Sequence, residues 1–256
     1  MRPYTEKIIS SWAKGCGGEI ISPIKDDQDM PHDTYAFLGV LRGSGDMLNN
    51  YDYYFIDHAY FLGGHDKKPA WYRVTKNGHN AYQIQERPSD RYEKYFKQDI
   101  KPWRSGNKII VCPPTGAIEW MFDTQSWLND TVGTLKQQTD REIVVRDKPM
   151  NPQVKRIDGI TTINGFVKTT VDRPLDEDLA EAHCVVTFNS GVAVKAICEG
   201  IPVICGKECA AYPISNTIQD VETLKHYDRQ TWLNSLSYGQ FTLDEMSSGF
   251  AYNQCS

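Results

Sequence analysis

The stretch from Cys184 to Pro202 constrains the fold more than any other part of the chain, and it reads CVVTFNSGVAVKAICEGIP. Residues 185–188 predict a buried strand, the polar turn 189–191 follows, and apolar residues then recur at helical spacing. Gly200 is expected to end this helix, and residues 201–204 predict a second apolar strand. A strand, turn, helix and strand in this order are typical of α/β proteins.

The same alternation of strands and helices begins upstream in the second half of the chain. Residues 108–112 predict a buried strand, residues 120–138 a helix, and residues 142–145 the next strand. Residues 35–41 and 53–57 predict two strands in the first half. These patterns predict an α/β fold with two Rossmann-like lobes, a cleft between them and helices at the C-terminus.

The charge distribution indicates where one lobe gives way to the next. Residues 67–104 carry ten Lys or Arg and four Asp or Glu, whereas thirteen basic and nineteen acidic residues follow Ser105. The local charge therefore changes from +6 to −6, which fits a domain boundary. We predict an N-terminal lobe over 1–104, a second lobe over 105–227, and helices over 228–256 that pack back on the first lobe.

The cysteine count, the apolar runs and the net charge exclude several classes of protein. The seven Cys are an odd number and most have apolar neighbours, which suits buried thiols in a reducing cytoplasm better than a disulfide framework. The chain contains no run of eighteen apolar residues, so we expect no membrane span. The first twelve residues also lack the apolar run of a secretion signal. The net charge of −5 argues against a nucleic-acid packaging protein. We therefore expect a cytoplasmic protein.

Three segments carry a resemblance to a known group of enzymes. The segment TFNSGVAVKAICEGIPVI resembles the donor site of GT-B glycosyltransferases, especially those of the capsule-polysaccharide type, over about twenty residues. The segment VVRDKP resembles their basic loop that grips donor phosphates, and TWLNSLSYGQFTLDEM resembles the tail of phage-encoded proteins of this kind. One departure is Lys195, which stands where such enzymes usually carry a Glu for the donor ribose.

This resemblance implies a GT-B glycosyltransferase that moves a sugar from a nucleotide-sugar to an acceptor hydroxyl, with the N-terminal lobe on the acceptor side. The phage-like tail implies host cytoplasm as the compartment if a phage encodes the chain, and a hydroxymethylated pyrimidine in phage DNA or a surface glycan as the acceptor. The nucleotide-sugar is a co-substrate, and we expect no further cofactor. We expect a metal-independent mechanism, because the Asp-x-Asp spacings at 27–29 and 176–178 lie in an acidic loop and an acidic helix.

The predicted donor site lies where strands of the second lobe end. A turn at a helix start presents backbone N–H groups to an anion, although Asn and Ser are also ordinary helix caps. Two cations beside a Pro suit a diphosphate, and a solvated surface pair is the alternative for them. Lys195 either meets a phosphate or lies in solvent. The predicted donor-binding residues are Thr115, Arg146, Lys148, Asn189, Ser190, Gly191 and Lys195.

The catalytic candidates are Asp57 and His58, at the carboxyl end of a predicted strand in the first lobe. An inverting transfer needs one general base to deprotonate the acceptor hydroxyl. Adjacent strand residues point to opposite faces, so only one of the two is expected to enter the cleft. A purely structural role is the alternative for both.

The basic and aromatic stretch 67–104 has two interpretations. It could bind a polyanion with its rings stacked on bases, or it could form an aromatic core with a solvated cationic face. The predicted acceptor contacts are Arg73, Asn77 and Arg42.

Two other classes of function remain open at this stage. One is a sugar-nucleotide hydrolase or epimerase of the same fold, because a fold does not determine chemistry. The other is a non-catalytic nucleic-acid-binding module. We predict no metal site, because Cys198, Cys205 and Cys209 are irregularly spaced and the chain has no C-x-x-C pair. The sequence does not determine the oligomeric state.

Overall fold

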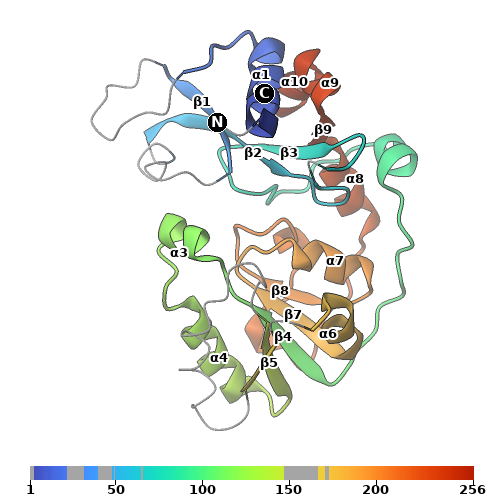
Figure 1. Ribbon diagram of the computed structural model, residues 1–256. Helices are drawn as coiled ribbons and strands as arrows, with labels where there is room; N and C mark the ends of the chain where they lie inside the picture. The colour runs from blue at the N-terminus through green and yellow to red at the C-terminus, as the bar shows by residue number, and fades with distance from the viewer. Residues whose placement is uncertain are drawn as a thin grey trace. The chain divides into compact units, whose positions relative to one another are not determined.

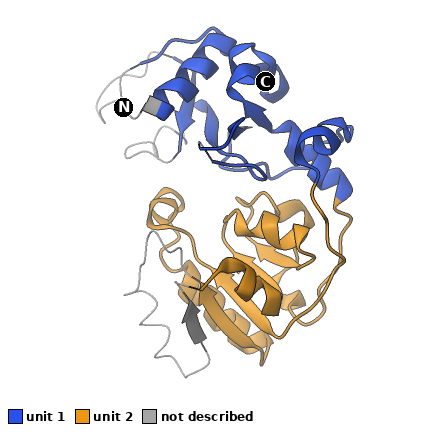
Figure 2. Cartoon of the chain, turned by 45° about the vertical axis from the view of Figure 1, so that its right-hand side comes forward, with its two compact units in different colours: residues 1–97, 230–256 blue, residues 98–229 orange. Residues whose placement is uncertain are grey.

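The protein is described by a computed structural model. It covers residues 3–21, 32–39, 48, 50–64, 66–146, 167–170 and 173–256, with only the backbone described for 167–170. The chain divides into two compact units (Figure 2). Unit 1 comprises residues 1–97 and 230–256, and unit 2 comprises residues 98–229. Each unit is described by itself below.

Unit 1 is built on a four-stranded mixed sheet of order β1-β2-β3-β9. Strands β1 and β2 are parallel, whereas β3 is antiparallel to both β2 and β9. The strands are β1 (Thr34–Leu38), β2 (Asp52–His58), β3 (Trp71–Lys76) and β9 (Gln240–Thr242). The fourth strand therefore comes from the far end of the chain, where the sequence predicts only helices.

Helices cover one face of this sheet (Figure 1). They are α1 (Pro3–Cys16), α9 (Leu243–Ser247) and α10 (Phe250–Cys255). Their core contains the buried side chains of Ile8, Trp12, Ile56, Val74 and Met246. The opposite face carries a second cluster of rings from Tyr35, Phe37, Tyr53 and Phe55. A capping box stands at the start of α9, where Thr242 and Glu245 exchange side-chain and backbone bonds.

Two further elements belong to the described part of unit 1. They are the π-helix η1 (Tyr92–Phe96) and the helix α8 (Gln230–Tyr238). The sequence predicts an ordinary helix over 88–98, and the structure has this shorter π-helical turn instead. The guanidinium of Arg91 lies beside it among five aromatic rings and forms an ion pair with Glu245, with Nη1 2.7 Å from Oε1. Much of the basic, aromatic stretch is thus the core of unit 1.

Unit 2 contains a five-stranded sheet of order β6-β5-β4-β7-β8, and every pairing in it is parallel. The strands are β4 (Lys108–Cys112), β5 (Glu142–Arg146), β6 (Val167–Thr170), β7 (Ala182–Thr187) and β8 (Val203–Cys205). From β4 the chain adds β5 and then β6 on one side of the sheet. It then adds β7 and β8 on the other side of β4. This is a doubly wound topology, and its switch point lies between β4 and β7.

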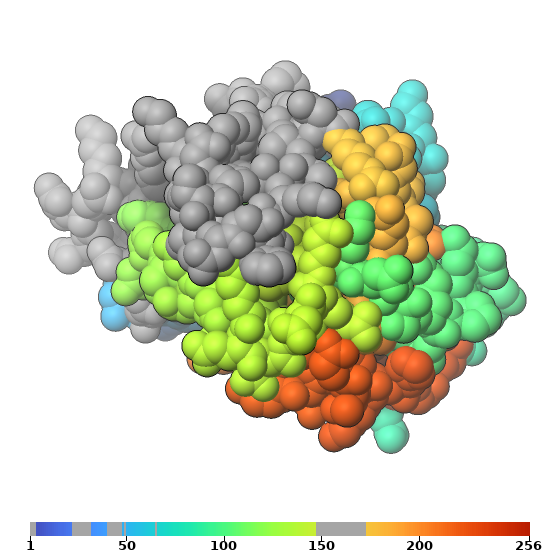
Figure 3. Space-filling view, turned by 90° about the horizontal axis from the view of Figure 1, so that it is seen from below, coloured from blue at the N-terminus to red at the C-terminus, as the bar shows by residue number. Residues whose placement is uncertain are grey.

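Helices lie on both sides of this sheet (Figure 1). They are α3 (Gly116–Phe122), α4 (Trp127–Gln138), α6 (Leu175–Glu181) and α7 (Val192–Cys198). The helix predicted over 120–138 is divided into α3 and α4, because Asp123 adopts a left-handed conformation with φ of 50°. Buried residues of α4 pack on Ile109, Val111 and Ile143, in a hydrophobic core cluster of unit 2. Figure 3 shows α4 and the chain around it on the surface seen from below.

Candidate functional site

The loops that follow β4 and β7 lie side by side at the switch point of unit 2. Cys112 and Thr187, the last residues of the two strands, are partners in the parallel register. The loops 113–116 and 188–191 therefore leave the same edge of the sheet from neighbouring positions. Ligands of doubly wound sheets bind outside the carboxyl ends of the strands at the switch point. The topology thus brings together Thr115 and the turn that contains Ser190.

The hydroxyl of Thr187 fixes this edge. It donates a hydrogen bond to the carbonyl oxygen of Cys112 at 2.7 Å, and it accepts one from the backbone N–H of Ser190 at 3.2 Å. Thr187 is 1% exposed, so both bonds are shielded from water. One side chain therefore joins the two strand ends and also sets the turn that leads into α7.

The turn residues differ in their exposure. Asn189 is buried, Ser190 is half-buried and Gly191 is exposed. The Ser190 hydroxyl accepts a bond from the backbone N–H of Val192 at 3.3 Å, a local bond typical of a capping residue. A Cβ atom built on Gly191 would meet no atom within 4 Å. The surface of the turn is therefore open at Gly191, where a ligand could approach the backbone closely.

Thr115 lies on the neighbouring loop. It is half-buried and is the N-cap residue of α3, and the two prolines before it are buried. Phe122 of α3 contacts Phe188 of the adjacent loop, with ring centroids 5.6 Å apart. This aromatic contact joins the end of α3 to the loop that follows β7.

Arg146 stands at the carboxyl end of β5, as the sequence predicts, but its guanidinium is committed to the protein. It forms an ion pair with Asp178 of α6, and it donates to the carbonyl oxygen of Arg173 at 2.7 Å. The side chains of Arg146 and Asp178 are 9% and 1% exposed, so this pair is buried. A donor phosphate would have to compete with Asp178 for the guanidinium. Lys148, the second predicted cation, lies outside the described residues.

Lys195 projects from α7 and contacts α6. Its ammonium forms an ion pair with the carboxylate of Asp176. The hydrogen bond from Lys195 and its positive charge lower the pKa of Asp176. Both residues are exposed, so the pair remains in contact with solvent.

Asp57 and Arg73 lie directly opposite each other on β2 and β3 of unit 1. Arg73 Nη2 is 2.9 Å from Asp57 Oδ2, and Arg73 Nη1 donates to the carbonyl oxygen of His58 at 2.9 Å. The backbone N–H of His58 donates to Asp57 Oδ1 at 2.8 Å. The structure thus joins a predicted catalytic residue to a predicted acceptor contact. The ring of His58 instead faces Tyr72, at 6.4 Å between centroids.

Asn77 lies at the opposite end of β3 from this cluster. It lies in a bend with Gly78 after the end of β3 and has a φ of 52°. Its side-chain oxygen accepts from the backbone N–H of Tyr53 at 2.8 Å, and its amide nitrogen donates to Asp52 Oδ1 at 2.9 Å. These bonds explain Asn77 as a turn residue. Arg42, the third predicted acceptor contact, lies outside the described residues.

His79 is a buried residue beside Asp57 and Arg73 that the sequence did not single out. Burial lowers its pKa to about 3, the positive charge of Arg73 adds to this effect, and the charge of Asp57 opposes it. The His79 ring also lies 4.7 Å from the ring of Phe55, and its Nδ1 is 2.8 Å from Asn80 Nδ2. His79 is therefore neutral at physiological pH and completes a polar cluster with Asp57 and Arg73.

Neither a metal cluster nor a membrane-spanning helix is found in the described parts of the chain. No group of three or more His, Cys, Asp or Glu side chains there could hold a metal ion. None of the helices there is long and apolar enough to cross a bilayer. All seven cysteines are free thiols.

No protein-family model matches the chain, and a comparison with curated proteins finds no match. Among solved structures, the KpsC beta Kdo 2,4 transferase of Thermosulfurimonas dismutans matches with a TM-score of 0.55 and 12% identity. The match covers 100% of this chain and 96% of that one. The chain has a GT-B-type fold.

Two other solved structures match at lower TM-scores. The KpsC beta Kdo 2,7 transferase of the same organism has a TM-score of 0.49 and 14% identity, over 86% of this chain and 85% of that one. The spinosyn rhamnosyltransferase SpnG, in complex with spinosyn aglycone, has a TM-score of 0.34 and 14% identity, over 70% and 47%. The GT-B-type assignment rests on the first match, and it confirms the predicted α/β fold class.

Proposed function

We propose that the protein transfers a sugar from a nucleotide-sugar donor to an acceptor hydroxyl. The observation that carries this proposal is the switch point of unit 2, where the loops 113–116 and 188–191 leave adjacent strand ends of a doubly wound sheet. This is the place where such sheets bind nucleotides. The GT-B-type fold supports the same class of chemistry, although a fold alone does not determine it.

The donor phosphates are proposed to lie against the open side of the turn at Ser190 and Gly191. Backbone N–H groups and the Thr115 loop would stabilise the negative charge that grows on the leaving nucleotide as the bond to the anomeric carbon breaks. Asn189 is buried and supports the turn. Arg146 is held by Asp178. Its contribution would therefore be to position the end of β5.

Asp57 and His58 are the proposed candidates for the general base. The base takes the proton of the acceptor hydroxyl, and the hydroxyl oxygen then attacks the anomeric carbon. Arg73 holds one oxygen of Asp57 and the backbone N–H of His58 holds the other. This orients the carboxylate, and a carboxylate oxygen can accept more than one hydrogen bond. We favour Asp57 on this ground and keep His58 as the alternative.

A saccharide is the acceptor that we favour. Arg73 and Arg91 of the basic stretch are held in ion pairs with Asp57 and Glu245, and most of the rings around them are buried. This arrangement leaves few rings to stack on bases, so a hydroxymethylated pyrimidine in DNA is the second candidate. The matched KpsC protein with a TM-score of 0.55 is a Kdo transferase by name, which makes a Kdo donor one to include in tests.

A thermal-shift panel of UDP-, GDP-, CMP- and dTDP-sugars tests the donor site. A ligand at a hundred times its dissociation constant adds about 2.7 kcal/mol of stability, so a true donor gives a clear shift. We expect one nucleotide class to shift the wild type and to shift Gly191→Ala less. A panel without any shift would remove the basis for a sugar-nucleotide enzyme.

Turnover assays separate the remaining classes. A transferase consumes the donor only when a saccharide or DNA acceptor is added, whereas a hydrolase or epimerase converts the donor alone. A nucleic-acid-binding module binds DNA with a steep salt dependence and ignores the panel. We expect Asp57→Asn to retain the thermal shift and lose turnover. If Asp57→Asn stays active and His58→Ala does not, the base is His58.

A further inference from the structure

Ser105 and His183 form a hydrogen-bonded pair at the amino-terminal edge of the unit 2 sheet. The Oγ atom of Ser105 is 2.5 Å from Nδ1 of His183. Ser105 lies three residues before β4 begins, and His183 is the second residue of β7. The loops of the candidate donor site leave the opposite, carboxyl-terminal edge of the same two strands. Neither residue therefore has a part in the proposed sugar transfer.

A β-bulge places His183 beside Ser105. Ala182 and Cys184 pair with consecutive residues of β4, so His183 is an extra residue of β7. A bulge disrupts the ladder locally and re-aims the side chain that it carries. The His183 residue is buried, with 6% of its surface exposed, whereas Ser105 is exposed. The pair thus joins a buried imidazole to a hydroxyl that solutes can reach.

The partner of the second ring nitrogen fixes the direction of this bond. Nε2 of His183 is 2.7 Å from the backbone carbonyl oxygen of Val221. A carbonyl oxygen only accepts, so Nε2 carries the hydrogen, and Nδ1 of the neutral ring is an acceptor. The Ser105 hydroxyl therefore donates its hydrogen to Nδ1. The Val221 carbonyl holds the ring in this tautomer and in this orientation.

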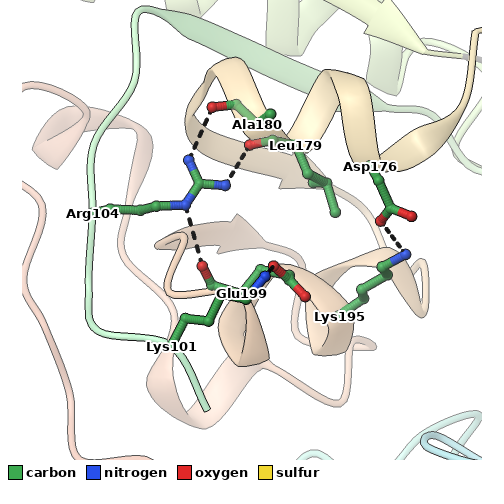
Figure 4. Close-up of a pocket in the computed structure, with 7 residues that line it drawn as sticks. All are labelled: Lys101, Arg104, Asp176, Leu179, Ala180, Lys195 and Glu199. Carbon is green, nitrogen blue, oxygen red and sulfur yellow. Dashed lines mark hydrogen bonds and ion pairs between the residues drawn. The ribbon is translucent and has the colours of Figure 1, made fainter. Parts of the chain in front are cut away.

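The backbone on both sides of Ser105 is held in place. Arg104 precedes it, and its guanidinium joins the ends of α6 and α7 (Figure 4). The guanidinium donates to the carbonyl oxygens of Leu179 at 2.7 Å, Ala180 at 3.1 Å and Glu199 at 3.3 Å. Gly106 follows Ser105 and donates its N–H to the carbonyl oxygen of Ala182 at 3.0 Å. A Cβ on Gly106 would lie 2.2 Å from the carbonyl oxygen of Glu181, so this close approach requires glycine.

A carboxylate lies near the imidazole. Hydrogen bonds from Thr139 and Arg141 lower the pKa of Glu222, the residue after Val221. The positive charges of Arg141 and His183 lower the pKa of Glu222 further. Because this attraction is mutual, the Glu222 carboxylate stabilises a positive charge on the His183 ring.

The hydroxyl, the imidazole and the carbonyl are arranged as an activated nucleophile requires. A serine hydroxyl is a weak nucleophile until a base takes its proton, and a third group orients the base. Here His183 is the base, and the Val221 carbonyl orients it. We propose that Ser105 is a nucleophilic serine that accepts an acyl group from an activated ester. This role does not rest on the proposed sugar transfer.

The acylation step conserves atoms and charge. Ser105 Oγ attacks the carbonyl carbon of the ester while the hydroxyl proton passes to Nδ1 of His183. The bond from that carbon to the alkoxy oxygen then breaks, and the leaving oxygen takes the proton from Nδ1. The products are an acyl-serine and an alcohol or a phenol. The step needs no oxidant, reductant or further reactant.

Acetylation of the whole chain by p-nitrophenyl acetate tests the proposal. Mass spectrometry of peptides reads the site of each acetyl group as the reaction proceeds. Ser126 is the internal control, because it is an exposed serine of the same unit. We expect Ser105 to be acetylated about a hundredfold faster than Ser126, because a positioned general base contributes at least this factor. Equal rates at the two serines would overturn the proposal.

Matched variants test the base. His183→Gln removes the base, but the Gln side chain still offers an N–H to the carbonyl that the ring contacts. We expect acetylation of Ser105 in this variant to fall to the rate of Ser126. The control is His32→Gln, at an exposed histidine of unit 1, which should acetylate as the wild type does. A His183→Gln protein that labels Ser105 as fast as the wild type would also overturn the proposal.

Two measurements on the wild type apply even if His183→Gln does not fold. In urea-denatured protein, Ser105 and Ser126 should be acetylated at similar rates, because unfolding separates Ser105 from its base. In D2O the native reaction at Ser105 should be slower, because the hydroxyl proton is transferred in the step. A fast rate that survives denaturation, or a native rate that is the same in D2O, would contradict the role of His183. A failed panel of nucleotide-sugars leaves all of these tests intact.

Discussion

Thr187 donates its hydroxyl hydrogen to the carbonyl oxygen of Cys112, and this bond joins the two strand ends at the switch point of unit 2. Thr187→Val keeps the shape of the side chain but removes this bond and the one from the Ser190 N–H. We expect a loss of about 1–3 kcal/mol in the free energy of unfolding, measured by urea titration, because buried polar groups lose their partner. Thr187→Ser retains the hydroxyl and should lose less. Equal losses in the two variants would contradict the role of the hydroxyl.

The buried pair of Arg146 and Asp178 should behave as a structural unit. Arg146→Met removes one of the two arginines that pair with the buried carboxylate of Asp178 and leaves Arg173 Nη1 3.4 Å from Oδ1, so we expect a loss of about 3 kcal/mol. The double variant Arg146→Met/Asp178→Leu should recover most of this loss, because the buried carboxylate is gone. Denaturant titrations of the two single variants and the double variant measure the coupling. Additive losses would show that the pair is not coupled.

Two glycines should respond oppositely to the same substitution. A Cβ on Gly191 meets nothing within 4 Å, whereas a Cβ on Gly200 would lie 2.0 Å from the carbonyl oxygen of Pro102, and Gly200 has a φ of 76°. We expect Gly191→Ala to keep the melting temperature and to weaken donor binding, and Gly200→Ala to lower the melting temperature strongly. If Gly191→Ala binds the donor as tightly as the wild type does, the donor phosphates do not lie against this turn.

His79 should make the protein sensitive to mild acid. Its pKa falls from about 6.5 in the unfolded chain to about 3 in the folded protein. The unfolded chain binds more protons between these values, so stability falls as the pH decreases below about 6.5. Between pH 7 and pH 5 we expect the wild type to lose about 2 kcal/mol more than His79→Gln. Parallel pH profiles for the two proteins would show that His79 does not titrate in this way.

Thiol reactivity should follow burial. Burial raises the pKa of Cys184 to about 12, of Cys198 to about 11 and of Cys255 to about 12. Because the thiolate is the reactive form, these cysteines should resist iodoacetamide at pH 8 in the native protein. Mass spectrometry should find Cys16, which is half-buried, labelled before Cys184, and all seven labelled in denaturant. Rapid native labelling of Cys184 would contradict its burial.

The sequence predicted unit 2 better than unit 1 for a physical reason. Central strands of a parallel sheet are buried on both faces, so β4 and β7 stand out as continuous apolar runs. In unit 1, β9 is only three residues long and lies within a segment that has helical spacing. Its pairing with β3 depends on residues about 170 positions apart, which no local pattern reveals.

The residues of the candidate site also divide into those that local patterns predict and those that depend on long-range contacts. The turn at Ser190 follows from local chemistry, and the sequence predicts it. The bonds of Arg146 were not, because the segment that provides Asp178 has the composition of an exposed acidic helix. His79 gave no signal, since a single histidine after a turn is common on protein surfaces. The sequence does not predict which polar groups pair over long distances in the chain.

The Trp103 ring stacks on His226 at 5.2 Å, and the Arg229 guanidinium lies 4.3 Å from the same ring. Arg229 also donates to the carbonyl oxygen of Lys101 at 2.8 Å. The segment that enters unit 2 is thus fastened to the segment that leaves it. The ribosome makes all of unit 2 before β9 and α9, so unit 2 can close on itself while the sheet of unit 1 still lacks its last strand. The first residues of unit 1 are translated earliest, but its sheet is completed only after unit 2 has been synthesised.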